Sequence, residues 1–150
     1  MAFPTATSRV CSRTALGLTR SIEDALENVA EAHGLELIKQ LDDVDGLFTK
    51  EFENSIYRIV QESLNNIIKH AAATQIDVRL TRSAGEVALI IEDNGQGFVV
   101  GATNKYGARQ GGFGLIGIVE RARLLGGQIT IESTVGVGTK IAAVFPLERV

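Results

Sequence analysis

The chain has 150 residues, of which 45% are hydrophobic and two are proline, a composition typical of one globular domain with its own core. Its 15 Lys and Arg against 18 Asp and Glu give a formal net charge of −3, without the basic excess of a nucleic-acid-binding protein. Cys11 is the sole cysteine, which excludes an intrachain disulfide and a thiolate metal cluster. The most apolar run, at 87–91, is too short to span a membrane.

The first half of the chain predicts helices around one strand. Residues 1–14 are small, polar and without periodicity, and we expect a loose leader there. Helical spacing of apolar residues predicts a helix over 15–32, and alternation predicts a strand over 35–40. A long helix is predicted over 50–72, because one apolar stripe is formed by Phe52, Ile56, Val60, Leu64 and Ile67.

The second half predicts more strands. Residues 75–82 and 86–93 are predicted strands joined by the hairpin turn "SAGE", and the polar, glycine-rich stretch 94–112 predicts a long loop. A helix and two strands then follow at 114–125, 128–133 and 139–147. Helices mixed with antiparallel strand pairs predict an α/β fold, a two-layer sandwich, with residues 15–150 as a single domain.

The segment "GGFGLIGIVERARLLGG" (111–127) places Gly112, Gly114 and Gly117 in the spacing of a dinucleotide-binding loop. Such a loop follows a buried strand directly, but the nearest upstream strand ends at Asp93, so the dinucleotide hypothesis fails. The glycines still precede a helix N-terminus, which favours an anion. Phosphate binding therefore remains, with close helix packing as the alternative.

A polar face of the helix predicted at 50–72 is the second candidate. At about 100° per residue, one side of this helix carries Glu62, Asn66 and Lys69, with His70 at its margin. A solvated face is the ordinary interpretation. A carboxylate beside an amide oxygen also suits a hard cation such as Mg²⁺, which in turn binds phosphate oxygens.

The stretch "EDNGQGF" follows the most apolar predicted strand. Asp93 stands at the strand end, and Gly95 and Gly97 allow a sharp turn and the close approach of another group. An EF-hand calcium loop is excluded, because its twelfth position is Asn104 rather than glutamate and no helix precedes it. A plain turn remains the alternative.

Four segments in this order resemble the asparagine box and three glycine boxes of the ATPase superfamily that includes DNA gyrase, the ninety-kilodalton heat-shock chaperone, sensor histidine kinases and mismatch-repair ATPases. They are "ESLNNIIKHA", "EDNGQGF", "GGFGLIGIVERARLLGG" and "GVGTK", the last an ordinary hairpin turn by itself. The resemblance covers 50–147 and is strongest to the ATP-binding catalytic domain of bacterial sensor histidine kinases of the nitrate-sensor-like subfamily. It implies a Bergerat-type fold, a mixed, mostly antiparallel sheet covered on one face by helices.

The resemblance implies a role for each matching residue. Glu62 resembles the catalytic acid, and Asn66 resembles the asparagine that binds Mg²⁺. Asp93 resembles the aspartate that recognises adenine. The other expected nucleotide-binding residues match phosphate-contacting or glycine-box positions, namely Lys69, His70, Gly95, Gly97, Gly112, Gly114, Leu115, Gly117 and Thr139.

The loop between the first two glycine boxes is expected to form a mobile cover over the nucleotide. It carries Lys105 and Arg109, which would attract triphosphate charge or simply be solvated loop cations. The role of Tyr106, packing on nucleotide or on a partner, is left open.

The implied function is binding of ATP with Mg²⁺ and transfer of the γ-phosphoryl group to a histidine on a separate dimerisation segment, in two-component signalling. The expected partners are the phosphoacceptor helices of a sensor kinase and a downstream response regulator. The chain departs from a complete kinase because His33 and His70 both lack the acidic context of a phosphoacceptor.

Two other functions stay open. The first is an anti-sigma-factor-type serine kinase, which the segments "ERARLLGG" and "GVGTK" disfavour. The second is an ATP-binding regulatory module without phosphoryl transfer, which the presence of Glu62, Asn66 and Asp93 disfavours. The first 18 residues have no apolar core of a signal peptide, so we expect a cytoplasmic domain. Membrane anchoring of a full-length protein is left open.

Overall fold

The computed structural model describes residues 4–98 and 113–147, except the side chains of 4–16, 70 and 113–116. Within these residues, one five-stranded sheet has the order β1-β2-β3-β5-β4. Its strands are β1 (Glu36–Leu41), β2 (Gln75–Arg82), β3 (Glu86–Asp93), β4 (Gln128–Thr134) and β5 (Gly138–Pro146). The helical elements are α1 (Pro4–His33), α2 (Lys50–Asn66), the π-helical turn η1 (Ile67–Ala71) and α4 (Phe113–Leu124).

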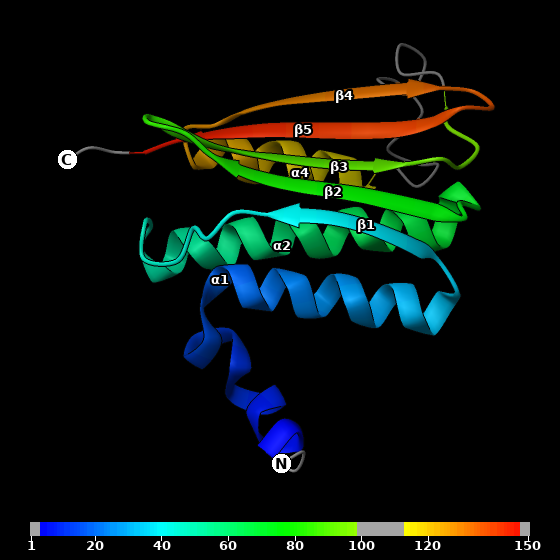
Figure 1. The fold of residues 1–150 in the computed structure, drawn as a ribbon. Helices are drawn as coiled ribbons and strands as arrows, with labels where there is room; N and C mark the ends of the chain where they lie inside the picture. The colour runs from blue at the N-terminus through cyan, green and yellow to red at the C-terminus, as the bar shows by residue number, and fades with distance from the viewer. Residues whose placement is uncertain (1–3, 99–112, 148–150) are drawn as a thin grey trace.

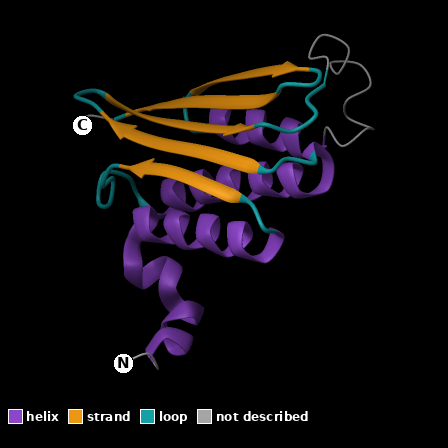
Figure 2. Ribbon diagram, turned by 45° about the vertical axis from the view of Figure 1, so that its right-hand side comes forward, coloured by secondary structure: helices purple, strands orange, loops and turns teal. Residues whose placement is uncertain are grey.

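The sheet and the helices form two layers. β1 pairs with β2 in parallel, while the β2–β3, β3–β5 and β4–β5 pairs are antiparallel. The α-helices lie along one face of the sheet and leave the other face uncovered (Figure 1 and Figure 2). The predicted two-layer α/β sandwich with a mixed, mostly antiparallel sheet is thus confirmed.

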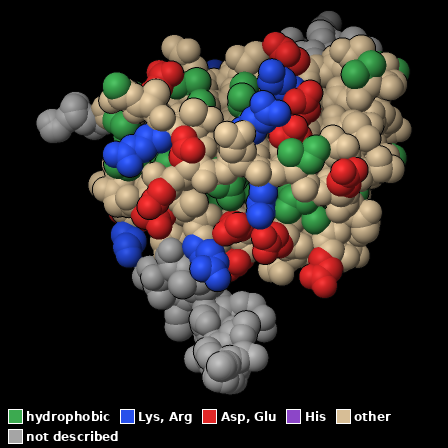
Figure 3. Space-filling view, viewed as in Figure 1, with side chains coloured by type: hydrophobic (Ala, Val, Ile, Leu, Met, Phe, Trp, Pro, Cys, Tyr) green, Lys and Arg blue, Asp and Glu red, His purple; other side chains and the backbone are tan. Residues whose placement is uncertain are grey.

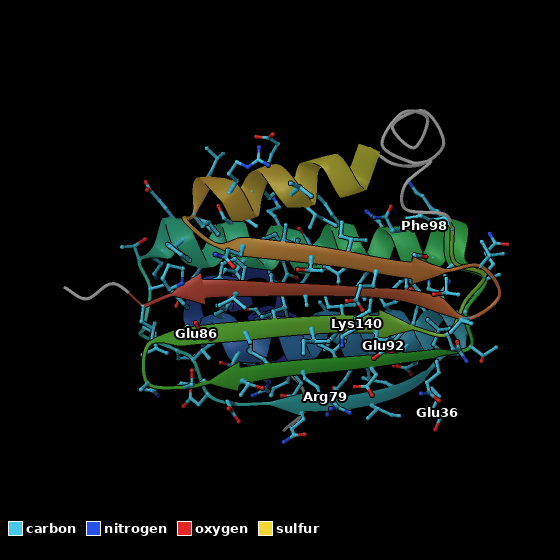
Figure 4. The ribbon with its side chains drawn as sticks, turned by 90° about the horizontal axis from the view of Figure 1, so that it is seen from above. Glu36, Arg79, Glu86, Glu92, Phe98 and Lys140 are labelled. Atoms are coloured by element: carbon cyan, nitrogen blue, oxygen red, sulfur yellow. The ribbon has the colours of Figure 1, made fainter. Side chains whose placement is uncertain are left out.

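Alternation along the strands decides which side chains face the helices. In β3, Val87, Leu89 and Ile91 are buried, while Glu86 and Glu92 on either side of them are exposed. Figure 4 looks onto the uncovered face and shows Arg79, Glu92 and Lys140 there, on neighbouring strands. The period of two therefore separates a buried apolar face from an outer face that carries charged residues.

The helix α2 packs its apolar stripe under the sheet. It begins after Thr49, whose Oγ1 accepts a hydrogen bond from the backbone N–H of Phe52 at 3.1 Å. Its buried residues are Ile56, Ile59, Val60, Ser63 and Leu64. After Asn66 the helix widens into η1 and ends where Ala72 adopts a left-handed φ of 53°. The helix predicted over 50–72 is confirmed, and its π-helical last turn was not foreseen.

The N-terminal segment differs from the expected loose leader. Helical backbone begins at Pro4 and is interrupted at Gly17, with φ 87° and ψ 170°. Because 5–16 contain neither glycine nor proline, nothing in the local sequence breaks a helix, although no apolar stripe marks one. After the kink, the backbone N–H of Thr19 donates to Asp45 Oδ1 at 2.9 Å. The segment before Gly17 points away from the sheet (Figure 1).

The core and the surface agree with a globular domain. Buried apolar residues from Leu18 to Phe145 form one hydrophobic cluster. On the face shown in Figure 3, basic side chains are interspersed with acidic ones, so this face offers no continuous basic surface. In the described part of the chain, no helix has the length and apolar character needed to cross a membrane.

Candidate functional site

The helix-facing side of the sheet changes from apolar to polar at one end. One apolar row across the strands consists of Val78, Ile91, Ile141 and Ile131. The next row, which we call the end row, consists of Ile76, Asp93, Thr139 and Ser133. Residues in register project from the same face, so three polar side chains lie side by side facing the helix layer. The end row lies where β3 ends, at the right in Figure 1.

Asp93 is the buried acid of the end row, with 8% of the residue exposed. Its Oδ1 accepts a hydrogen bond from the backbone N–H of Gly95 at 2.7 Å, and the backbone N–H of Thr139 also donates to its carboxylate. Burial raises the pKa of Asp93, and these two N–H bonds partly oppose that effect. The predicted position of Asp93 at a strand end is confirmed.

Three glycines let backbone segments pack directly around Asp93. A Cβ atom at Gly95 would collide with the carbonyl oxygen of Ala71 in η1, and one at Gly97 with that of Thr134. Gly138, with φ 141°, is held against the carbonyl oxygen of Asp93 in the same way. The end of η1, the loop after β3 and the start of β5 therefore converge on one place.

A second group of polar residues lies between α2 and α4. The Nη2 atom of Arg121 is 3.2 Å from Oε2 of Glu62, and both side chains are half-buried. Gly117 allows this contact, because a Cβ atom there would lie 2.9 Å from Oε1 of Glu62. The polar face of α2 is thus covered by α4 at Glu62, whereas Lys69 further along stays exposed.

Buried polar atoms in this second group lack partners. Within the described residues, Oε1 of Glu62, Nδ2 of Asn66 and Nε of Arg121 are buried and make no hydrogen bond. A buried polar atom without a partner is costly, so such atoms in a native fold indicate a water, an ion or a ligand. Glu62 and Asn66 lie one helical turn apart on α2, which makes this face the natural place for a bound group.

The remaining predicted site residues fall into two sets. Lys69 is exposed on η1, and Gly114 and Leu115 lie in the first turn of α4. Gly112, the side chain of His70 and the loop residues Lys105, Tyr106 and Arg109 lie outside the described residues.

Sequence patterns did not single out three residues that shape the site. Arg121 holds Glu62, and Ser133 is the outer member of the end row. Asn94 ties the loop after Asp93 to β2, because its Oδ1 accepts the backbone N–H groups of Thr74 and Gln75, both at 2.9 Å. Arg121 and Asn94 lie inside the two quoted glycine boxes without an assigned role, and Ser133 continues the inward-facing alternation of Ile129 and Ile131.

This fold and site define an ATP-binding domain of the kinase and ATPase type. Residues 51–149 match the family described as Histidine kinase-, DNA gyrase B-, and HSP90-like ATPase. The chain belongs to this family, which confirms the resemblance of the four boxes.

Curated relatives and solved structures agree with the family. A Chloroflexus aurantiacus protein named an uncharacterized sensor-like histidine kinase is 38% identical over 135 residues, 88% of this chain and 23% of that protein. The signal transduction histidine-protein kinase/phosphatase DegS of Bacillus subtilis is 36% identical over 103 residues, 69% of this chain and 26% of DegS. The chain thus spans about a quarter of the length of these relatives.

The fold is also that of a known kinase domain. The histidine kinase domain of the blue-light activated histidine kinase from Erythrobacter litoralis EL346 superposes with a TM-score of 0.72 at 20% identity. The match covers 87% of this chain and 61% of that one.

Proposed function

We propose that the chain binds ATP with Mg²⁺ and transfers the γ-phosphoryl group to a histidine on a separate dimerisation segment, as the catalytic domain of a sensor histidine kinase. The observation that carries this proposal is the buried carboxylate of Asp93 at a strand end, enclosed by Gly95, Gly97 and Gly138. The names of the curated relatives support histidine as the acceptor. The proposed domain spans 15–150 and, because it uses ATP, works in the cytoplasm.

Asp93 suits the recognition of adenine. An ionised carboxylate only accepts hydrogen bonds, and adenine presents an amino group at position 6. Guanine presents a carbonyl oxygen at the same place, which the carboxylate would repel. The glycines beside Asp93 let the backbone of Ala71 and Thr134 pack against the loop that follows this carboxylate.

The polar face of α2 fits a magnesium ion with its triphosphate. Asn66 would supply an amide oxygen to Mg²⁺, and its Nδ2 atom is buried without a hydrogen-bond partner among the described residues. A magnesium ion held there would neutralise phosphate charge. Lys69, exposed on η1 one turn further, is available to the phosphates.

Glu62 is proposed as the group that accepts a proton during transfer. Arg121 holds Oε2, which leaves Oε1 available to another donor. As the acceptor imidazole nitrogen bonds to the γ-phosphorus, the bond from phosphorus to the bridging oxygen breaks and ADP leaves. The imidazole proton passes to the Glu62 carboxylate. The resulting phosphohistidine would then serve a response regulator.

Replacing Asn66 with alanine is expected to weaken ATP binding in the presence of Mg²⁺ by about tenfold or more, because even outer-shell partners of a bound metal change affinity by that factor. The fold should persist, since Asn66 is off the buried stripe of α2. Calorimetry with and without Mg²⁺ measures the effect, and circular dichroism checks the fold.

Asn65→Ala is the matched control, because Asn65 is the exposed neighbour on the same helix. It should bind like the original chain. If Asn66→Ala keeps the original dependence on Mg²⁺ while correctly folded, Asn66 does not bind the metal.

A further inference from the structure

The hydroxyl of Ser133 connects three parts of the site. It lies 2.8 Å from Oγ1 of Thr139 and 3.2 Å from the carbonyl oxygen of Gly138. It also accepts a hydrogen bond from the backbone N–H of Phe98 at 2.8 Å. Ser133 on β4 therefore joins the start of β5 to the end of the glycine loop that follows Asp93. Figure 4 shows Phe98 at this end of the sheet.

The number of protons fixes the direction of these bonds. A serine hydroxyl has one donor and two acceptor sites. The backbone N–H of Phe98 occupies one acceptor site of the Ser133 hydroxyl. The carbonyl oxygen of Gly138 can only accept a hydrogen bond, so this bond uses the single proton of Ser133. When both bonds are made, the contact with Thr139 requires that Thr139 donates to Ser133. The proton of Thr139 is then used, and its oxygen faces any ligand as an acceptor only.

Thr139 is also bonded to Asp93. Its backbone N–H donates to the Asp93 carboxylate, and the two residues are in register on adjacent strands. Ser133, Thr139 and Asp93 thus form a continuous hydrogen-bonded line across β4, β5 and β3. At the Asp93 end of this line, two acceptors lie side by side: the carboxylate of Asp93 and the hydroxyl oxygen of Thr139.

We propose that Ser133 is a positioning residue for base selection: by holding the hydroxyl proton of Thr139, it keeps Thr139 and Asp93 as a paired acceptor for a purine with an amino group at position 6. This inference rests on the proposed binding of ATP and goes beyond it. Without the Ser133 hydroxyl, the Thr139 side chain regains its freedom to rotate and to donate, and the backbone N–H of Phe98 loses its partner.

The test compares ATP with purine ribonucleoside triphosphate, which lacks the 6-amino group, by calorimetry with Mg²⁺. Ser133→Ala is expected to raise the Kd for ATP about threefold to tenfold, the effect of one hydrogen bond, and the Kd for the analogue less than about twofold. Ser133→Thr, which keeps the hydroxyl, should restore most of the ATP affinity. Ser83→Ala is the matched control, because the hydroxyl of Ser83 donates to the carbonyl oxygen of Glu86 in the β2–β3 hairpin, and it should leave both values unchanged.

The outcomes separate the inference from the proposed function. A selective loss for ATP supports Ser133 as a positioning residue. An equal loss for both nucleotides shows a purely structural role and overturns the inference, as does unchanged ATP binding by Ser133→Ala. If the original chain binds neither nucleotide, the proposed function itself is wrong.

Discussion

Replacing Asp93 with asparagine is expected to lower the affinity for ATP by about tenfold or more, because a hydrogen bond to a charged group is worth about 1.5–3 kcal/mol. Asparagine keeps the shape of the side chain but loses the negative charge, and its NH2 group cannot accept a hydrogen bond as the second carboxylate oxygen does. Calorimetry with Mg²⁺ measures the loss. Equal ATP binding by the original chain and Asp93→Asn would exclude Asp93 from adenine recognition.

Asp77→Asn provides the matched control. Asp77 lies on neighbouring β2, on the uncovered face, where its carboxylate contacts Arg79 at 3.3 Å. This substitution removes the same charge from the chain without touching the end row. ATP affinity should therefore remain that of the original chain.

The burial of Asp93 also predicts a pH dependence. Burial raises the pKa of Asp93, so this carboxyl takes up a proton at a higher pH than an ordinary aspartate. Its contribution to the stability of the folded chain is present at low pH and is lost as pH rises through the raised pKa. ATP binding depends on pH in the opposite direction, because it needs the ionised carboxylate of Asp93. Affinity should fall as pH decreases through the pKa of Asp93, and this component should be missing in Asp93→Asn.

Replacing Gly138 with alanine is expected to destabilise the fold by about 2–5 kcal/mol, the combined size of backbone strain and an overpacked contact. Gly138 has φ 141°, and its Cβ would collide with the carbonyl oxygen of Asp93. Chemical denaturation measures the free energy of unfolding.

Gly85→Ala is the control for that substitution. Gly85 lies in the β2–β3 hairpin, and a Cβ atom there would meet nothing within 4 Å. Its free energy of unfolding should stay within about 0.5 kcal/mol of the original chain. If Gly138→Ala were as stable as Gly85→Ala, the close approach of β5 to Asp93 would not be a feature of the fold.

Local pattern was sufficient for most of the fold. The bounds of β2 follow from alternation, those of β3 follow from a short apolar run, and α2 follows from its apolar stripe. The helical start of α1 at Pro4 was missed, because it depends on backbone propensity without an amphipathic pattern. The π-helical turn at the end of α2 has no distinctive spacing and was missed for the same kind of reason.

The site was only partly predictable because its contacts join distant segments. Asp93 could be placed, since the end of a strand is a local feature. Arg121 is 59 positions from Glu62, and Ser133 is 35 positions from Phe98. The periodicity of a single sequence carries no information about such pairs. The register of β3, β5 and β4 was needed to show Asp93, Thr139 and Ser133 as one row.

The proposed function depends on phosphoryl transfer to a separate histidine, which can be followed with labelled ATP. Incubated alone, the chain should form no acid-labile phosphohistidine, because neither of its two histidines, His33 and His70, has the setting of an acceptor. Adding a dimerisation segment that bears an acceptor histidine should give label on that histidine, and Glu62→Ala or Asn66→Ala should suppress it. Label on His33 or His70 of the isolated chain, label on a partner serine, or ATP binding without any transfer would contradict the account.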